Sequence, residues 1–370
     1  MTKPIYVTQP LIPPLEEFIP YLEKIWANKI LTNGGEMHQA LEKELAEYLG
    51  VKFVSLFSNA TIALLTAMKA LKITGEVITT PYSFVATTHS LLWNELRPVF
   101  VDICEDSLNI DPSKIENSIT KHTRAILPVH VYGNPCGIHE IKKIADKYNL
   151  KIIYDAAHAF GVSFEGQSIL NHGDLSVLSF HATKIFNTFE GGAIISSSKE
   201  MKKHIDDLKN FGFRSETVVA EVGINGKMSE INAAFGLLQI KHMKSAEMRR
   251  ANIASRYING LKRIKGVDIK KGKVSEYLSP NHSYFPIFIN EKFPLSRDDL
   301  YEKLKLENIY ARRYFYPLIS SFDMYKKYPS SNENNLSVAN KISEAVLCLP
   351  IYPALEDSAV DKVIDIISEC

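Results

Sequence analysis

Short apolar runs recur along the N-terminal half of the chain, each about as long as a β-strand. Between several of them lie helix-length stretches whose apolar positions are three or four residues apart. In residues 138–148, for example, Ile141, Ile144 and Ala145 share one side. This alternation predicts an α/β fold with a mostly parallel, helix-covered sheet. The expected strands are residues 53–56, 76–79, 97–101, 125–129, 152–154, 175–180 and 193–196.

The two ends of the chain carry other patterns. Residues 15–26 and 36–49 have the spacing of amphipathic helices that pack on the core or on a partner subunit. A long helical stretch over residues 229–261 precedes a mixed C-terminal part. We therefore expect a large domain over residues 1–245, with the N-terminal helices, and a smaller α+β domain over residues 246–370. The elements expected in the smaller domain are a strand over 283–289 and helices over 297–307 and 357–368.

Composition excludes several classes of function. Lys and Arg total 43 against 42 for Asp and Glu, so no overall charge recruits nucleic acid or an acidic membrane. No stretch reaches the roughly 18 apolar residues of a membrane span, and the N-terminus lacks the apolar run of a signal peptide. We expect a soluble, cytoplasmic protein. The 4 cysteines form no Cys-x-x-Cys pair, which argues against a zinc site or disulfide scaffold, so we expect no metal.

Lys184 is the first candidate for chemistry. It follows an apolar strand and precedes Gly191 and Gly192. A lysine amine that is desolvated at the mouth of a buried sheet becomes a nucleophile and can form a Schiff base with a carbonyl. Taken alone, a lysine in this place is usually a solvated charge, so its companions decide the interpretation.

Asp155 is the second candidate, because it ends the apolar run 152–154 and so lies where α/β sheets bind ligands. An aspartate there can pair with the ring nitrogen of a pyridine cofactor, or it can simply cap the turn that follows. The two interpretations have equal weight on spacing alone. His158 follows closely and could hydrogen-bond a phenolic oxygen of the cofactor, although an isolated histidine is more often a core residue.

Two further segments follow strand ends. Small polar residues from Ser58 to Thr61 lead into a helix that starts near Ile62, and backbone amides at such a helix start suit a phosphate. A plain helix cap is the simpler interpretation of this segment. Phe84 follows the next strand and could stack on a planar ring or belong to the core.

In this order, these motifs resemble the DegT/DnrJ/EryC1/StrS family, the sugar aminotransferase branch of the fold-type I pyridoxal phosphate enzymes. The resemblance implies an aspartate aminotransferase-like fold and pyridoxal 5′-phosphate as cofactor. The segments that carry it are residues 31–35, 58–61, 81–88, 128–133, 154–159, 179–192, 223–234 and 312–318.

The family pattern implies a role for each candidate. Lys184 would bind the cofactor as a Schiff base and carry protons, and Asp155 would pair with the pyridine nitrogen. The remaining cofactor contacts implied are Phe84 stacking on the ring, His158 at the phenolic oxygen, and Ala60, Thr61, Ser179 and Asn225 at the phosphate. Asn225 would reach the phosphate of a neighbouring subunit, so a homodimer with shared active sites is implied, and Lys227 is the alternative for that contact. Ala60 stands where glycine is frequent, so we expect negative φ there.

The resemblance also implies two substrates, L-glutamate as amino donor and a nucleotide-linked ketosugar as acceptor. Residues 185–192 are similar to those of enzymes that aminate dTDP-4-keto-6-deoxyglucose at C4. Amination at C3, or of a UDP- or GDP-linked ketosugar, remains an alternative. Tyr314 and its aromatic neighbours could face the sugar or base, and Arg312 or Arg313 could meet the diphosphate. The resemblance further suggests a role in O-antigen and lipopolysaccharide biosynthesis.

Two other classes of protein remain to be considered. A Rossmann dehydrogenase would share the sheet, but no Gly-x-Gly-x-x-Gly fingerprint follows any expected strand. A non-catalytic regulator or binding protein on the same fold would lose Lys184 or Asp155, and both are present. The family's dehydratases carry histidine in place of the lysine, so Lys184 favours transamination.

Overall fold

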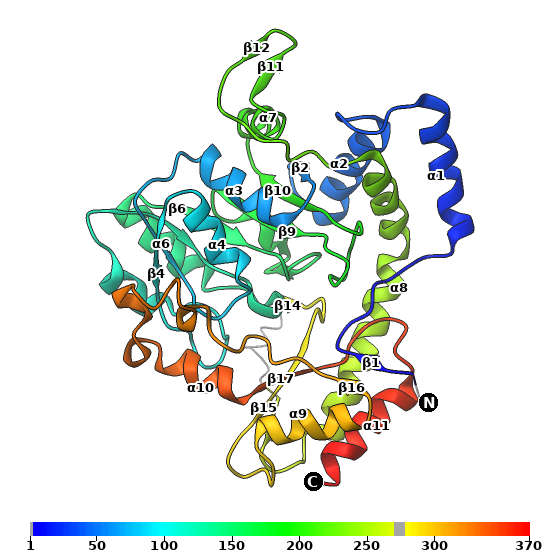
Figure 1. Ribbon diagram of the computed structural model, residues 1–370, viewed down its shortest axis with the longest axis vertical. Helices are drawn as coiled ribbons and strands as arrows, with labels where there is room; N and C mark the ends of the chain where they lie inside the picture. Colours follow the sequence, from blue (N-terminus) through cyan, green and yellow to red (C-terminus); the bar gives the residue numbers. More distant parts are fainter. Residues whose placement is uncertain (1–2, 270–277) are drawn as a thin grey trace.

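A computed structural model describes residues 3–269 and 278–370 (Figure 1). Its largest sheet has 7 strands in the order β2-β10-β9-β6-β5-β3-β4, and β10 is the one strand of this sheet that runs opposite to the others. The expected mostly parallel sheet is confirmed. Its strands are β2 (Phe53–Phe57), β3 (Glu76–Thr79), β4 (Arg97–Phe100), β5 (Thr123–Leu127), β6 (Lys151–Asp155), β9 (Leu175–Ser179) and β10 (Gly192–Ser196).

The strand expected over residues 125–129 begins and ends two residues earlier, as β5. Pro128 has no N–H to donate, so regular pairing stops before it. Val129 still makes an isolated bridge with Asp155. The consequence is that the chain beyond β5 stays beside the end of β6, where the candidate aspartate lies.

Both faces of the sheet are covered, because successive side chains of a strand point to opposite faces. On β10, Ala193 and Ile195 pack in the core with the N-terminal helices, whereas Ile194 packs in the core on the other face. The first face holds α1 (Leu15–Asn28), α2 (Glu36–Leu49) and the start of α8 (Glu230–Leu261), with α6 (Ile138–Tyr148) farther along. The second holds α3 (Ala60–Ala70), α4 (Ala86–Trp93) and α7 (Lys199–Leu208).

Helix α8 links the central sheet to the C-terminal part (Figure 1). Phe235 near its start packs in the first core, and Tyr257 near its end packs in a separate C-terminal core. The helix runs without interruption across residues 245 and 246. The C-terminal core is built on the antiparallel strands β13 (Val267–Asp268), β15 (Phe285–Ile289) and β17 (Val346–Leu349), with α9 (Arg297–Leu306) and α11 (Asp357–Ser368).

Several short elements join distant segments or project from the body. The β11–β12 hairpin (Phe213–Ser215 and Val218–Val219) extends away from the rest of the molecule at the top of Figure 1. Val219 on this hairpin is 59% exposed, and nearby Val222 is 85% exposed. The other short elements are β1 (Ile5–Tyr6) beside β16 (Ile309–Tyr310), β7 (Ser163–Phe164) between β8 (Gln167–Ser168) and β14 (Leu278–Ser279), α5 (Pro112–Ile115) and α10 (Ser337–Ala345).

Candidate active site

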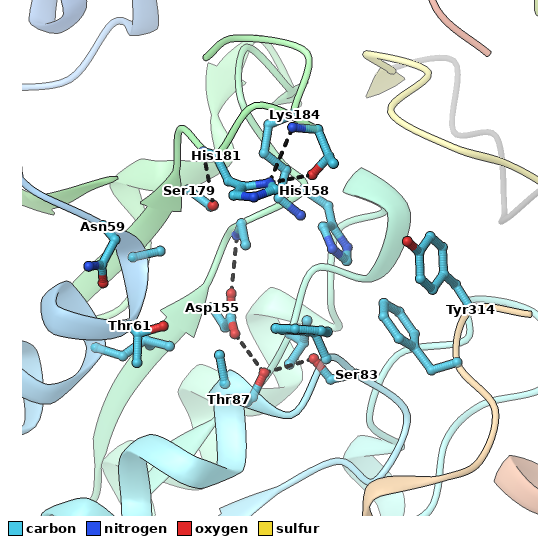
Figure 2. A pocket seen from close by; sticks show the side chains of 18 of the residues that line it. Asn59, Thr61, Ser83, Thr87, Asp155, His158, Ser179, His181, Lys184 and Tyr314 are labelled. Atoms are coloured by element: carbon cyan, nitrogen blue, oxygen red, sulfur yellow. Dashed lines mark hydrogen bonds between the residues drawn. The ribbon is translucent and has the colours of Figure 1, made fainter. Parts of the chain in front are cut away.

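The candidate active site is a cavity of about 270 Å³ at the carboxyl ends of β6 and β9. Ligands of α/β proteins bind at this edge of the sheet. Figure 2 shows Asn59 and Thr61 on one side of Asp155 and Tyr314 on the opposite side. Of the predicted cofactor contacts, those that line the cavity are Ala60, Thr61, Phe84, Asp155, His158, Ser179 and Lys184.

Asp155 is buried and held by donors from two segments. Its Oδ2 accepts a hydrogen bond from Oγ1 of Thr87 at 2.7 Å, and its Oδ1 accepts one from the N–H of Ala157 at 3.1 Å. The hydroxyls of Thr87 and Ser83 are themselves 2.8 Å apart. Burial raises the pKa of Asp155, while Thr87, Ala157 and the charge of Lys184 oppose that rise. The bond to Ala157 is the turn cap that the sequence allowed, yet the carboxyl group also faces the cavity, where a cationic ring nitrogen would stabilise its charge.

Lys184 lies in the loop between β9 and β10 and is half-buried. Its backbone N–H donates to the carbonyl of His181 at 2.8 Å, and its Nζ donates to Oη of Tyr284 at 3.3 Å. Loss of solvation lowers the pKa of Lys184 to about 8, although Asp155 and Tyr314 act in the opposite direction. A minor but much larger fraction of the amine than in an ordinary lysine is therefore uncharged near neutral pH, and the uncharged amine is the form that attacks carbonyl groups and accepts protons.

The first turn of α3 forms another wall of the cavity. Asn59 caps this helix, since its side chain accepts a hydrogen bond from the N–H of Ile62 at 2.9 Å. The helix starts at Ala60, two residues before the expected position, and Ala60 lies outside the left-handed region, as the sequence predicted. A Cβ on Gly192 would lie 2.6 Å from the N atom of Ala60, so this packing requires glycine. Free N–H groups at a helix start and the nearby hydroxyls of Thr61 and Ser179 suit an anionic group.

His158 is buried in the wall of the cavity. Its Nδ1 accepts a hydrogen bond from the N–H of Tyr132 at 3.2 Å, which assigns the proton of the neutral ring to Nε2. Burial, and then the charge of Lys184, lower the pKa of His158 well below its ordinary value. His158 therefore offers a neutral N–H donor. Phe84 lines the same cavity but is 59% exposed, so in the single chain its ring is not a core residue.

Other predicted contacts lie outside the cavity. Asn225 is exposed, and its Oδ1 accepts a hydrogen bond from Nζ of Lys227 at 2.9 Å. Arg313 forms an ion pair with Asp298 at 2.7 Å, and Arg312 does not line the cavity either. In contrast, the aromatic Tyr314 does line it. The predicted role of Asn225 therefore depends on a second subunit.

Sequence analysis missed the residues that support this site. Thr87 lay within a recognised motif, but nothing in its spacing pointed to Asp155. Tyr284 reaches Lys184 from 100 residues farther along the chain, so no local pattern could identify it. The N–H of Tyr132 became a partner of His158 only through tertiary packing. One signal in the sequence could have indicated Tyr132. It lies in the segment 128–133, which carries the family resemblance but was given no role in the site.

Two further kinds of feature are absent from residues 3–269 and 278–370. Within these ranges, no group of three or more His, Cys, Asp or Glu side chains is arranged to hold a metal ion. Nor does any helix in the same ranges have the length and apolar character needed to cross a membrane.

Comparison with known proteins identifies the family of this chain and two similar proteins. A family model described as the DegT/DnrJ/EryC1/StrS aminotransferase family matches residues 15–368. A protein of Shigella dysenteriae named dTDP-4-amino-4,6-dideoxy-D-glucose transaminase is 57% identical, with 100% of both chains covered. An Escherichia coli protein of the same name is 56% identical, with 98% of this chain and 97% of the relative covered.

A solved structure has the same fold. It is described as DesI in the presence of its TDP-sugar product, and it superimposes with a TM-score of 0.95 at 32% identity. The alignment covers 100% of this chain and 93% of DesI. The likeness extends over both the central sheet and the C-terminal part.

Proposed function

This chain belongs to the DegT/DnrJ/EryC1/StrS aminotransferase family, and we propose that it aminates C4 of dTDP-4-keto-6-deoxy-D-glucose to give dTDP-4-amino-4,6-dideoxy-D-glucose. It is a pyridoxal phosphate-dependent aminotransferase. L-glutamate is the proposed amino donor. The full-length identity of 57% to the Shigella relative is the observation that supports this sugar over other ketosugars.

The cavity fits the cofactor in the chemistry of its side chains. Lys184 has an amine of lowered pKa for the aldehyde carbon, and Asp155 has a buried carboxyl group for the ring nitrogen. The α3 N-terminus with Thr61 and Ser179 offers donors for the phosphate. These residues line one cavity, as the expected cofactor requires. When bound, pyridoxal phosphate supplies an electron-withdrawing ring beside the carbon that gains or loses the amino group.

Lys184 has two proposed tasks. It would hold the cofactor covalently, and its free amine would move a proton to or from the substrate carbon. A positioned acid or base contributes about 10² to 10⁴ in rate when its pKa lies near the working pH. A pKa of about 8 meets that condition, because the amine can both accept and donate a proton near neutral pH.

The other residues orient the ring. We assign Asp155 to the pyridine nitrogen, where its negative charge favours the protonated ring. His158 would donate from Nε2 to the phenolic oxygen, which its neutral state and its bond from Tyr132 both allow. Phe84 would stack on the ring. Ala60, beside Thr61, would contribute backbone contacts to the phosphate.

The proposed assembly is a homodimer with shared active sites. Two features support it: the exposed apolar residues on and beside the β11–β12 hairpin, and the position of Asn225 outside its own cavity. Asn225 or Lys227 would complete the phosphate site of the partner. We also propose the division into domains at residues 1–245 and 246–370, a cytoplasmic location, and use of the product in O-antigen biosynthesis.

Product analysis tests the proposed substrate. Purified protein is incubated with dTDP-4-keto-6-deoxy-D-glucose, L-glutamate and pyridoxal phosphate, and the sugar product is examined by NMR and mass spectrometry. We expect an amine at C4 with the glucose configuration. An amine at C3, or turnover only with a UDP- or GDP-linked ketosugar, would overturn the substrate. A chain that binds the cofactor but aminates no nucleotide sugar would instead be a regulator or binding protein.

A further inference from the structure

Tyr284 contacts the amine of Lys184, and none of the roles above uses its hydroxyl group. Oη of Tyr284 lies 3.3 Å from Nζ of Lys184, and Nζ lies 5.8 Å from the centre of the tyrosine ring. The same ring packs against His158 at a centroid distance of 4.8 Å and lines the cavity. Tyr284 therefore lies beside two residues that are assigned to the cofactor.

The segment that carries Tyr284 is fastened to the loop after β6. Nδ2 of the buried Asn281 donates to the carbonyl oxygens of His158 at 2.8 Å and Phe160 at 2.9 Å. Oγ of Ser283 also donates to the carbonyl of His158, at 2.9 Å. Three hydrogen bonds thus tie residues 281–284 to the wall of the cavity. A side chain supported in this way holds its place more accurately than one on a free loop.

The hydroxyl of Tyr284 can serve both charge states of the amine. Burial raises the pKa of Tyr284 well above its ordinary value, so the hydroxyl keeps its proton. A tyrosine hydroxyl both donates and accepts, an ammonium only donates, and a neutral amine also has a lone pair that accepts. The other titratable groups near Nζ are Asp155 and Tyr314, which favour the ammonium, and His158, which stays neutral.

We propose that Tyr284 is a positioning residue that holds Nζ of Lys184 while the amine carries a proton to and from the substrate carbon. This inference rests on the proposed aminotransferase function. A proton that leaves the substrate carbon is transferred to Nζ, and the two electrons of the broken C–H bond remain on the substrate side. Oη accepts a hydrogen bond from the resulting ammonium and donates one to the neutral amine. Tyr284 itself neither gains nor loses a proton.

The variant Tyr284→Phe removes only the hydroxyl. Tyr257→Phe is the matched control, because Tyr257 is buried in the C-terminal core and its hydroxyl has no hydrogen-bond partner among the described residues. We expect kcat of Tyr284→Phe to fall about tenfold with little change in KM for the ketosugar. The reason is that the variant loses one hydrogen bond to a charged group, the ammonium of Lys184. Tyr257→Phe should keep wild-type kcat. Circular dichroism verifies that both variants are folded.

A second measurement needs neither cofactor nor sugar. Labelling of Lys184 in the apo-protein by an amine-directed acylating reagent is followed against pH by peptide mass spectrometry. Without Oη the ammonium loses an acceptor, so the labelling inflection should move down by about half a pH unit or more in Tyr284→Phe and stay unchanged in Tyr257→Phe. Unchanged kcat together with an unmoved inflection would overturn the inference. A wild-type protein that aminates no sugar, with a shifted inflection, would instead overturn the substrate assignment alone.

Discussion

Oγ1 of Thr87, in the first turn of α4, donates a hydrogen bond of 2.7 Å to Oδ2 of Asp155 at the end of β6. The two residues are 68 positions apart in the chain. This bond stabilises the ionised carboxyl group against the burial that raises its pKa. It therefore helps to keep Asp155 negatively charged, and we propose that this charge pairs with the pyridine nitrogen.

Removal of that hydroxyl should weaken cofactor binding. We expect Thr87→Val to lower both kcat and affinity for pyridoxal phosphate about tenfold, because a hydrogen bond to a charged group is lost at nearly constant volume. Thr88→Val is the control, since the buried hydroxyl of Thr88 has no hydrogen-bond partner among residues 3–269 and 278–370. Equilibrium titration of apo-protein with cofactor measures the effect. Equal affinities of the two variants would contradict the role of Thr87.

Lys184 should destabilise the apo-protein at neutral pH. Its folded pKa is about 8 against 10.5 for an unburied lysine. Below about pH 8 both folded and unfolded chains carry the ammonium, so the folded state bears the full cost of desolvation. As pH rises above about 8 the folded state releases its proton first, and that cost declines.

We therefore expect Lys184→Met to be more stable than the wild-type apo-protein at neutral pH, by an amount that shrinks as pH rises from about 8 toward about 10. Urea unfolding at several pH values measures the difference. Lys43→Met, at an exposed position of α2, is the control and should show no such gain. A wild-type chain that is the more stable one at neutral pH would refute this account.

Gly192→Ala should disturb the phosphate site. The new Cβ would lie 2.6 Å from the N atom and 2.8 Å from the Cα of Ala60, so the start of α3 must shift. We expect affinity for pyridoxal phosphate to fall about tenfold, because the shift of α3 would weaken one hydrogen bond to the charged phosphate. Gly166→Ala is the control: at φ 75° it strains a turn, but no atom lies within 4 Å of its Cβ. It should lower stability and leave cofactor affinity unchanged, and the same affinity for both variants would count against the phosphate site.

Mixed dimers test the shared active site. Lys184→Ala should abolish turnover, and Asn225→Asp should weaken cofactor binding because it sets a negative charge against a phosphate. In a mixed dimer, one of the two sites would receive an intact Lys184 from one subunit and an intact Asn225 from the other. At a cofactor concentration too low to saturate Asn225→Asp, we expect the co-expressed variants to show more activity than the two separate variants together, but less than wild type. Activity no greater than the sum of the separate variants would rule out sharing, and light scattering supplies the assembly size.

Local pattern determined much of this fold. The spacing of Ile141 and Ala145 predicted α6 with the bounds observed, and the apolar run 76–79 predicted β3. These predictions succeeded because helix and strand periodicity reflect which side chains face the core. They were less accurate where one residue type overrides the pattern, as at Pro128 beyond β5.

The sequence by itself determined the order of the elements, the candidates Lys184 and Asp155, and the family to which their motifs point. Only the tertiary structure decided which partners give these groups their chemistry. Thr87 and Tyr284 meet them from distant segments, and burial moves the pKa of Lys184 down and that of Asp155 up. Desolvation and hydrogen bonding depend on everything packed around a group, and local spacing carries no record of neighbours that arrive from elsewhere in the chain.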